Sequence, residues 1–425
     1  MPAPPEHAVA ESHIIARVHA SVLDVDPQAW NALLAQQAHA TPFMRHEYLA
    51  ALETSGSATP RTGWTPRFLT LWDAGVLVAA CPLYLKNHSY GEYVFDFAWA
   101  RAYEEHGLAY YPKAVVAVPF TPVPGTRLLA RDAAARTALV AALRDWCTQQ
   151  GVSSLHLLFG SAEDMAACSA DDWMLRHTVQ FHWQNAAPDP APALACGMAP
   201  GGLDAPASYA SFGAFLASLS QEKRKKIRQE RRRVADAGVQ FRWARGCDIT
   251  PADWDFFYRC YERTYLEHGN APYLTRDFFQ RMQQDLPQAW VLFVAEREGH
   301  PIATSLIAVS ACPISAGGQK DQNSNALVAY GRYWGALERV DCLHFEACYY
   351  QPLQWCIAQG VQRFEGGAQG EHKMARALLP VQASSAHWLA HPAFADAVDR
   401  FLEREGAGVA QYLDALHSRS PFRHT

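Results

Sequence analysis

The densest group of chemically capable side chains lies near the C-terminal end, between Glu365 and Arg376. Closely spaced glycines let a backbone approach a ligand, and the acidic, imidazole and basic side chains beside them supply proton transfer and anion binding. The sequence therefore predicts a reacting centre in this stretch. The alternative is a solvent-exposed loop whose charges pair with one another. The residues of the predicted site are Gly366, Gly367, Gln369, Gly370, Glu371, His372, Lys373 and Arg376.

Two shorter segments of the same half carry weaker signals. Residues 331–336 follow an apolar run, and their backbone N–H groups are suited to hold an anion. Glu346 shares one face of an expected helix with two tyrosines, and aromatic residues at this spacing are usually core. An acid beside them near a helix start nevertheless makes Glu346 a second candidate base. The candidate anion-binding residues are Gly331, Arg332 and Gly335.

A polar and aromatic loop follows an expected hairpin strand in the first half of the chain. Aromatic rings stack on ligands and lysines contact phosphates, so the loop is suited to bind a sugar-nucleotide or peptide acceptor. A hydrogen-bonded turn with no ligand is the equal alternative. The candidate acceptor-binding residues are Lys86, His88, Tyr90, Glu92, Asp96 and Lys113.

The elements that position these residues come from an internal repeat. The heptapeptide Trp-Cys-Thr-Gln-Gln-Gly-Val at 146–152 recurs as Trp-Cys-Ile-Ala-Gln-Gly-Val at 355–361, each time closing a helical stretch and opening an apolar run. Two further pairs match in the same order, a turn entering a helix and a pair of apolar runs joined by a Gly turn. The repeat predicts two copies of one mixed α/β domain, at 12–185 and 239–425, joined by a linker and a basic helix at 186–238. Helices are expected at 27–37, 45–55, 131–150, 209–219, 252–268, 276–285 and 344–359, and a strand at 93–98.

Bulk properties fit a packed globular protein. The chain has 425 residues, of which 49% are hydrophobic and 19% charged, and a net charge of −5 argues against a nucleic-acid coat. No apolar stretch approaches the roughly 20 residues that cross a bilayer, and the first ten residues do not resemble a secretory signal. We therefore expect a cytoplasmic protein without membrane insertion. The ten cysteines lie singly, which predicts free thiols and no metal site.

One basic run departs from the acidic balance. Eight of the eleven residues from Lys223 to Arg233 are lysine or arginine, and Gly238 follows as a helix stop. Such a run is usually the solvated face of a linker helix. It equally suits the phosphates of a nucleotide-linked substrate or of an RNA such as tRNA.

Helices followed by a strand meander, then by a helix and another strand, are the order of the GNAT acyltransferase fold. The chain resembles the tandem-GNAT Fem-type transferases, which attach amino acids to peptidoglycan precursors. It resembles more closely the bacterial family of peptidoglycan biosynthesis/recognition proteins. The segments that carry the closer resemblance are 84–96, 110–113, 119–123, 180–183, 331–335, 344–351 and 364–373.

The resemblance implies an α/β (α+β) protein of two tandem GNAT-like domains, each a mixed, mostly antiparallel sheet flanked by helices. It implies an N-acyltransferase that moves an acyl or aminoacyl group from a coenzyme A thioester or an aminoacyl-tRNA to an amine, with no tightly bound cofactor. The amine belongs to a small molecule or a peptide, and a cell-wall precursor is one candidate. A peptidoglycan-precursor recognition protein without activity and an acetyl-CoA-dependent acetyltransferase of small amines are the alternatives.

The resemblance also implies roles for the predicted site. Lys373 matches the lysine after the paired glycines of Fem-type enzymes and would contact the oxyanion or a phosphate, with His372 or Glu371 as the base. The register departs from the Fem pattern, since Phe-Glu-Gly-Gly at 364–367 replaces Asp-Phe-Gly-Gly. The segment at 331–336 half matches the pyrophosphate loop of coenzyme A enzymes, which would need Gly or Ala at Leu337. By this resemblance the residues expected to bind the donor are Gly331, Arg332, Gly335, Gly366, Gly367, Gln369, Gly370 and Arg376. The equivalent turn of the first domain, after Phe159, holds no Lys or His, which places the expected reacting centre in the second domain.

Overall fold

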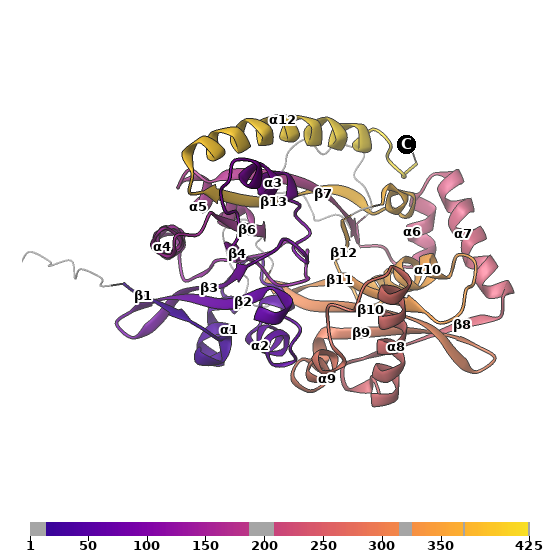
Figure 1. Ribbon diagram of the computed structural model, residues 1–425. Helices are drawn as coiled ribbons and strands as arrows, with labels where there is room; N and C mark the ends of the chain where they lie inside the picture. Colours follow the sequence, from indigo (N-terminus) through magenta and orange to yellow (C-terminus); the bar gives the residue numbers. More distant parts are fainter. Residues whose placement is uncertain (1–13, 187–207, 314–324, 369, 424–425) are drawn as a thin grey trace, which may run out of the picture.

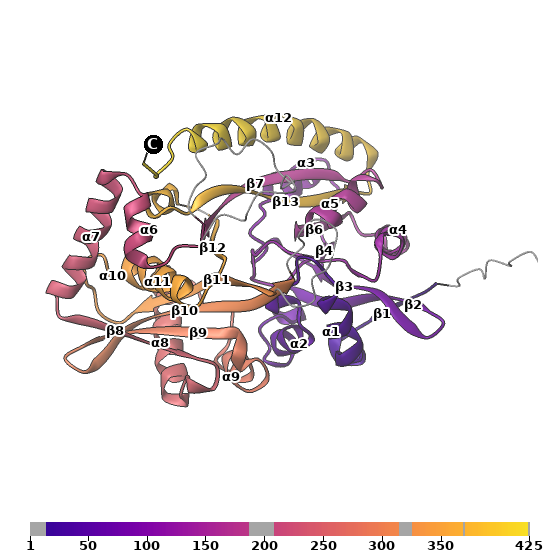
Figure 2. The ribbon, with the colours of Figure 1, turned by 180° about the vertical axis from the view of Figure 1, so that it is seen from behind.

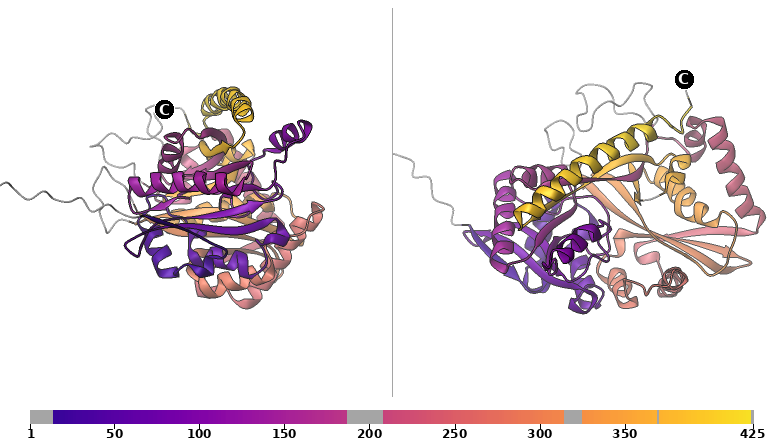
Figure 3. Two further views of the ribbon diagram at one scale, coloured as in Figure 1. Left: turned by 60° about the vertical axis from the view of Figure 1, so that its left-hand side comes forward. Right: turned by 45° about the horizontal axis from the view of Figure 1, so that its top comes forward.

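The structure is a computed structural model that describes residues 14–186, 208–313, 325–368 and 370–423. Figure 1 shows two α/β units side by side, with the long helix α12 (Pro392–His417) lying across the top of both. The view from behind gives the same arrangement (Figure 2). Turning the top of the molecule forward shows α12 running along the strands that join the units (Figure 3). None of the described helices combines the length and apolarity that crossing a membrane requires.

The two units repeat one order of elements. The first contains β1 (Ile15–His19), α1 (Pro27–Ala35), α2 (His46–Thr54), β2 (Trp64–Asp73), β3 (Val76–Lys86), α3 (Phe97–Glu105), β4 (Lys113–Val116), β5 (Leu129–Ala130), α4 (Ala133–Gln150), β6 (Ser154–Gly160), α5 (Ala162–Ser169) and β7 (Met174–Gln184). Helices α6 (Phe212–Ser218) and α7 (Gln221–Asp236) follow. The second unit contains β8 (Val239–Arg245), α8 (Pro251–Glu267), α9 (Arg276–Asp285), β9 (Trp290–Arg297), β10 (His300–Pro313), β11 (Asn325–Ala336), α10 (Leu343–Phe345), a π-helical turn (Glu346–Tyr350), α11 (Gln351–Ala358), β12 (Arg363–Ala368), a 3-10 helix (Glu371–Arg376) and β13 (Leu379–Leu389), before α12.

The repeated heptapeptide ends a helix in both copies. Gly151 after α4 and Gly360 in the turn after α11 have φ of 64° and 67°, the left-handed conformation that glycine adopts without strain. The valine that follows each glycine donates its N–H to the cysteine of the same copy, Val152 to Cys147 and Val361 to Cys356. Both valines and both cysteines are buried. The repeat therefore encodes a helix stop that turns the chain directly into the next core strand.

The predicted secondary structure is confirmed for most helices. Those expected at 27–37, 45–55, 131–150, 252–268 and 276–285 are present, with ends displaced by at most two residues. The helix expected at 344–359 is present but contains the π-helical turn. The strand expected at 93–98 is wrong, because Asp96 lies at the start of α3 and its carboxylate is bonded to buried partners.

All strands join one continuous sheet in the order β1-β2-β3-β4-β6-β13-β7-β12-β11-β10-β9-β8, with β5 beside β3. The two units exchange their last strands. Strand β13 of the second unit pairs antiparallel with β6 of the first, and β7 of the first unit pairs antiparallel with β12 of the second. The exchanged strands also pair with each other. The predicted fold, two tandem GNAT-like units with mostly antiparallel strands, is confirmed, while the boundaries at 12–185, 186–238 and 239–425 stay a prediction.

Alternation along the strands builds a core on each face of the sheet. On β9, Leu292 and Val294 join the core under α8 and α9, whereas Val291 and Phe293 join the core under α6 and α11. Successive strand side chains point to opposite faces, so the apolar run of β9 is buried on both. Figure 1 shows α8 and α9 on one side of this part of the sheet and α10 on the other.

The strand exchange makes a testable prediction about the two halves. We expect residues 1–207 or 208–425, expressed alone, to lack cooperative thermal unfolding, because each half leaves strand edges unpaired that the other half covers. Co-expression of the two halves should give one folded complex on size-exclusion chromatography. Either half unfolding alone at the temperature of the intact chain would contradict the exchange.

Candidate functional site

The feature that organises the candidate site is an opening between two parallel strands. β11 and β12 pair only where Val328, Ala329 and Tyr330 lie beside residues 363–365. Beyond this point both strands continue without pairing to each other, and Gly331 and Gly366 are the first residues past the last pair. Past the last pair the facing strand edges no longer satisfy each other's N–H and C=O groups, which leaves room for hydrogen bonds with a ligand, except at the carbonyls of Gly366 and Gly367, which accept from Lys373.

A cavity lies on each face of the sheet at this opening. One, of about 270 Å³, is on the side of α8, whose Tyr261 and Tyr265 form part of its wall. The other, of about 150 Å³, is on the side of α10 and the π-helical turn, with His344 and Tyr349 in its wall. Both cavities are lined by Gly331, Arg332, Tyr333 and Gly366. The opening is thus approached from both faces through the same four residues.

Arg332 lies at the centre of the opening. The pairing of β10 with β11 passes from Tyr333 to Gly331 and skips Arg332, which is the extra residue of a bulge. Its guanidinium donates to the Phe120 carbonyl at 3.1 Å and to the Tyr333 hydroxyl at 3.2 Å, and lies 5.1 Å from the Phe43 ring centroid. Aromatic rings from both units thus hold a fixed positive charge where the strands separate.

Gly366 and Gly335 are glycine for two different structural reasons. A side chain on Gly366 would place Cβ 2.2 Å from Leu378 and 2.9 Å from the Phe181 carbonyl, so this position admits no other residue without a shift. Gly335 does not line either cavity. Its Cβ would lie 2.0 Å from the Cys260 carbonyl of α8, and we therefore assign Gly335 to the close packing of β11 on that helix. Gln369 lies outside the described residues.

Lys373 is tied to the end of β12. Its ammonium donates to the carbonyls of Gly366 at 2.6 Å and Gly367 at 3.3 Å, which fixes the turn beside the opening. Only 6% of the residue is exposed, and burial lowers the pKa of the amine to about 8. A lysine with such a pKa exchanges its proton close to neutral pH.

The basic helix α7 supplies the partners of two other predicted site residues. Arg376 is 1% exposed and forms an ion pair of 2.8 Å with Glu230, which also accepts a hydrogen bond from the Tyr350 hydroxyl. Glu346 forms an ion pair of 3.0 Å with Arg231. These pairs attach α7 to the helices behind the opening, and the Glu346 carboxylate is held by Arg231 and Gln351.

The side chains of Glu371 and His372, the remaining candidates of the stretch from 365 to 376, point in different directions. Glu371 accepts hydrogen bonds from Tyr412 and Arg419, which are on and just after α12, so its carboxylate faces away from the opening. His372 is exposed, its ring rests near Tyr349, and partial burial lowers its pKa. Gly370 precedes them with φ of 95°.

His344 is a functional candidate that the sequence pattern did not single out. It lines the smaller cavity, and burial together with the nearby charges of His372, Arg376 and Lys373 lowers its pKa to about 4. Its imidazole is therefore neutral near pH 7 and carries one acceptor nitrogen. No spacing signal marks it, because it stands at the start of a short helix beside residues of the core.

The candidate acceptor residues of the first unit fall into two groups. Lys113, Glu92 and Asp96 form a buried ion cluster, with Lys113 2.8 Å from Glu92 and bonded to Asp96, and burial raises the pKa of Glu92 to about 7. Lys86 lies near this cluster, over the Trp64 ring at 3.7 Å, and burial lowers its pKa to about 7. These four side chains hold the loop at 87–96 onto the sheet.

His88 and Tyr90 lie apart from that cluster. They line a cavity of about 330 Å³ together with Phe120 and Tyr273, which also form a stacked pair with centroids 4.8 Å apart. Phe120 belongs to the wall of the 270 Å³ cavity as well. The two cavities are therefore neighbours across one ring, on the α8 side of the opening.

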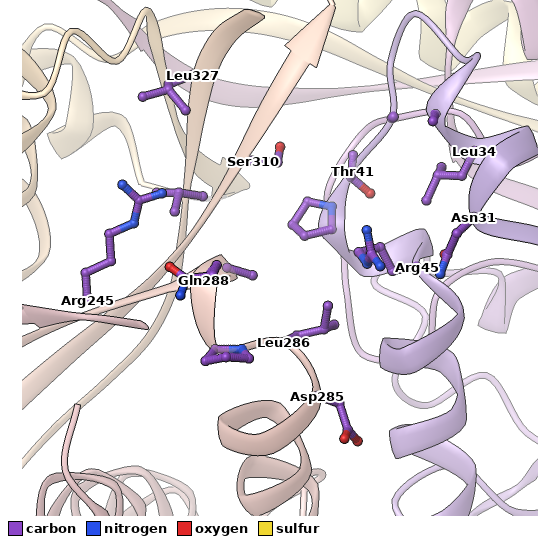
Figure 4. Close-up of a pocket in the computed structure, with 16 residues that line it drawn as sticks. Asn31, Leu34, Thr41, Arg45, Arg245, Asp285, Leu286, Gln288, Ser310 and Leu327 are labelled. Carbon is purple, nitrogen blue, oxygen red and sulfur yellow. The ribbon is translucent and has the colours of Figure 1, made fainter. Parts of the chain in front are cut away.

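A roomier cavity of about 550 Å³ lies between the two units and holds none of the predicted site residues. Figure 4 shows Arg45 and Arg245 on opposite sides of it, with Leu286 and Gln288 between them. Arg45 is paired with Glu47 at 2.6 Å. Most of the wall is apolar, and it shares no residue with the opening.

Comparisons with known proteins agree with this architecture. The family model FemAB_like, described as peptidoglycan biosynthesis/recognition, matches residues 21–190 and 205–424. No curated protein sequence matches the chain. Among solved structures the chain is similar to FemX, with a TM-score of 0.50 and 8% identity over 88% of this chain and 98% of that chain. At this identity the likeness concerns the fold alone.

Two further structures show lower similarity. The C-terminal domain of a putative lysylphosphatidylglycerol synthetase from Agrobacterium fabrum has a TM-score of 0.47 and 10% identity, covering 90% of this chain and 97% of that one. A tandem GNAT protein from the clavulanic acid biosynthesis pathway has a TM-score of 0.43 and 13% identity, covering 89% and 99%. The family model spans most of both units, including the opening between β11 and β12. The chain therefore belongs to the FemAB-like family of peptidoglycan biosynthesis/recognition proteins.

Proposed function

We propose that the chain is an N-acyltransferase that moves an acyl or aminoacyl group from an activated donor to an amine at the opening between β11 and β12. The observation that carries the proposal is the pair of cavities that meet at Gly331, Arg332, Tyr333 and Gly366. A donor on one face of the sheet and an acceptor on the other would meet there with their reacting atoms in contact. Holding two reactants in this way converts a bimolecular step into an effectively unimolecular one.

The reaction requires the protein to stabilise the oxyanion, to transfer the amine proton and to hold the end of β12 in place. The amine nitrogen attacks the donor carbonyl carbon, a C–N bond forms, and the bond from that carbon to the donor sulfur or oxygen breaks. We assign stabilisation of the developing oxyanion to Arg332 and to unpaired backbone N–H groups at the opening. We assign acceptance of the amine proton to His344, whose imidazole is neutral, and His344 then returns this proton to the departing sulfur or oxygen. Lys373 keeps the end of β12 in place.

The first unit offers no comparable opening. β4 and β6 pair at Ala114–Val116 with Leu155–Leu157 and then separate in the same way. Past this point Ala117, Leu158 and Phe159 are buried against Val94 and Ala383. Apolar side chains fill the equivalent position, which supports a reacting centre in the second unit and an acceptor-binding role for the first.

The exposed basic side chains of helix α7 are the feature that distinguishes between the two candidate donors. Ile227, Glu230 and Val234 face the protein, and the opposite side exposes basic side chains. Lys225, Lys226, Arg228, Arg232 and Arg233 are exposed. A row of exposed cations suits a phosphate backbone and favours aminoacyl-tRNA over coenzyme A as donor. A cell-wall precursor as acceptor fits the description of the family.

The first prediction concerns Arg332. Arg332→Gln keeps hydrogen-bond donors but removes the charge, and we expect about a 100-fold fall in kcat/KM for acyl transfer, because the developing oxyanion loses its charged partner. The assay offers purified protein acyl-CoAs or charged tRNAs with amine acceptors and follows the product by mass spectrometry. Arg339→Gln, on an exposed arginine outside the opening, is the matched control.

The same assay separates the proposed function from its alternatives. Unchanged kcat/KM in Arg332→Gln would remove Arg332 from the mechanism. If wild-type protein binds cell-wall peptides but gives no product with any donor, the chain is a recognition protein. Turnover only with acetyl-CoA and small amines would make it a small-amine acetyltransferase.

The second prediction concerns the donor. We expect the double variant Lys225→Glu, Arg228→Glu to bind tRNA about ten-fold more weakly and with a shallower dependence on salt, because two phosphate contacts are lost. Filter binding at several salt concentrations measures both quantities. The control is Arg400→Glu, Arg404→Glu, which reverses two exposed charges on α12. A wild-type protein that binds tRNA no better than this α7 variant would leave coenzyme A as the donor.

A further inference from the structure

A further polar cavity, of about 250 Å³, lies between the two units and shares no lining residue with the opening. Its wall comes from β7, β11, β12 and β13, from the end of β6 and the turn after it, from residues 124–125, and from the loop before the helical turn at 42–44. The polar residues that carry the argument are Thr41, His182, Arg363 and Glu365.

Glu365 is the acidic group of this cavity and is paired with Arg363, which also lines it. Glu365 is 4% exposed, and its Oε1 accepts from the Arg363 guanidinium at 2.8 Å. Its Oε2 is buried and has no hydrogen-bond partner among the described residues. His182 Nε2 stands 3.9 Å from Oε2, beyond hydrogen-bond distance. Burial raises the pKa of Glu365 to about 7 and lowers that of His182 to about 3, so the imidazole is neutral and does not neutralise the carboxylate.

Thr41 supplies a second unpartnered oxygen in the wall of the same cavity. The residue is 5% exposed, and its Oγ1 has no hydrogen-bond partner within the described part of the chain. Buried polar atoms are nearly always hydrogen-bonded in folded proteins, and each exception calls for a bound donor. The unpartnered oxygens of Glu365 and Thr41 can both accept a hydrogen bond, so a bound donor group would satisfy them.

We propose that this cavity binds a primary amine as its ammonium ion, with Glu365 as counter-charge and Thr41 as a second acceptor. An ammonium carries three N–H donors and one positive charge, which match a buried carboxylate oxygen and a hydroxyl oxygen without partners better than a neutral alcohol does. A metal ion is a poorer match, because the described residues contain no cluster of three or more metal-ligating side chains. The site goes beyond the proposed function, since it lies outside the opening where the acyl group would be transferred.

The experiment compares two ligands of nearly equal shape on the full chain. We expect n-butylamine to bind saturably at about pH 8, and n-butanol to bind at least about ten-fold more weakly, in ligand-observed NMR titrations. Glu365→Gln should weaken n-butylamine binding by about ten-fold or more because it removes the counter-charge, and Thr41→Val by a smaller factor. Glu104→Gln removes an exposed carboxylate on α3 and is the matched control. Thermal unfolding checks that each variant is folded.

The pH dependence of n-butylamine binding to the wild type is a second test, which needs no variant. Affinity of the wild type for n-butylamine should fall as pH drops through about 7, because Glu365 gains a proton and loses its charge. The other charged or titratable groups around the carboxyl are Arg363 on β12, His182 on β7, Tyr330 on β11, Arg127 before β5, and His39 in the loop before the 42–44 turn. Glu365→Gln should show no such pH dependence over this range.

Three outcomes would overturn the proposal. They are equal binding of n-butylamine and n-butanol, no saturable binding of n-butylamine to the wild type, and wild-type affinity in Glu365→Gln. If Glu365→Gln fails to fold, unchanged wild-type affinity between about pH 8 and pH 6 overturns it equally. Acyl transfer in the opening is measured separately, so it stands or falls independently of this site.

Discussion

Backbone pairing across the unit boundary is the constraint on which the rest of the structure depends. A strand edge buried without partners would leave several N–H and C=O groups unsatisfied, which is costly in a folded protein. The edge of β6 is paired with β13, and the edge of β12 is paired with β7. Each unit therefore completes the sheet of the other. The central strands of each unit therefore depend for their pairing on a strand from the other half of the same chain.

The opening is a consequence of the same exchange. β7 holds β12 from one side with a register that extends from Arg363 to Ala368, so β12 need not follow β11 beyond Glu365. Parallel strands that separate in this way leave a gap, and the sequence decides what fills it. In the first unit Phe159 and its apolar neighbours fill the gap, whereas in the second unit Gly331 and Gly366 line a cavity there. The same arrangement of strands therefore has a gap filled by apolar side chains in the first unit and a gap with cavities in the second.

Local sequence signals predicted the local structure well. The heptapeptide marked both helix stops because glycine in the left-handed conformation and the valine after it act within a few residues. The hairpin turns at Ala74-Gly75 and Glu298-Gly299 were visible for the same reason, and all four residues have positive φ. Gly331 and Gly366, two of the candidate site residues, both line the opening, but no sequence signal indicates that the two strands separate there.

Long-range contacts were not predictable from spacing. Nothing in the run from Lys223 to Arg233 indicates that Glu230 and Arg231 turn inward to pair with Arg376 and Glu346, because the partners lie more than 100 residues away. The acceptor cluster of Lys113, Glu92 and Asp96 depends in the same way on strand packing. The prediction of a strand at 93–98 was wrong because the tertiary ion pair of Asp96 outweighs the β-propensity of the aromatic residues beside it.

The most direct measurement of the central claim is a crystal structure of the protein with a non-hydrolysable donor analogue, a thioether of acyl-coenzyme A or an amide-linked aminoacyl-tRNA end. The account predicts that the acyl group lies between β11 and β12, with its carbonyl beside Gly331, Arg332 and Gly366. An acyl group found between β4 and β6 of the first unit, or in the 550 Å³ cavity between the units, would contradict it.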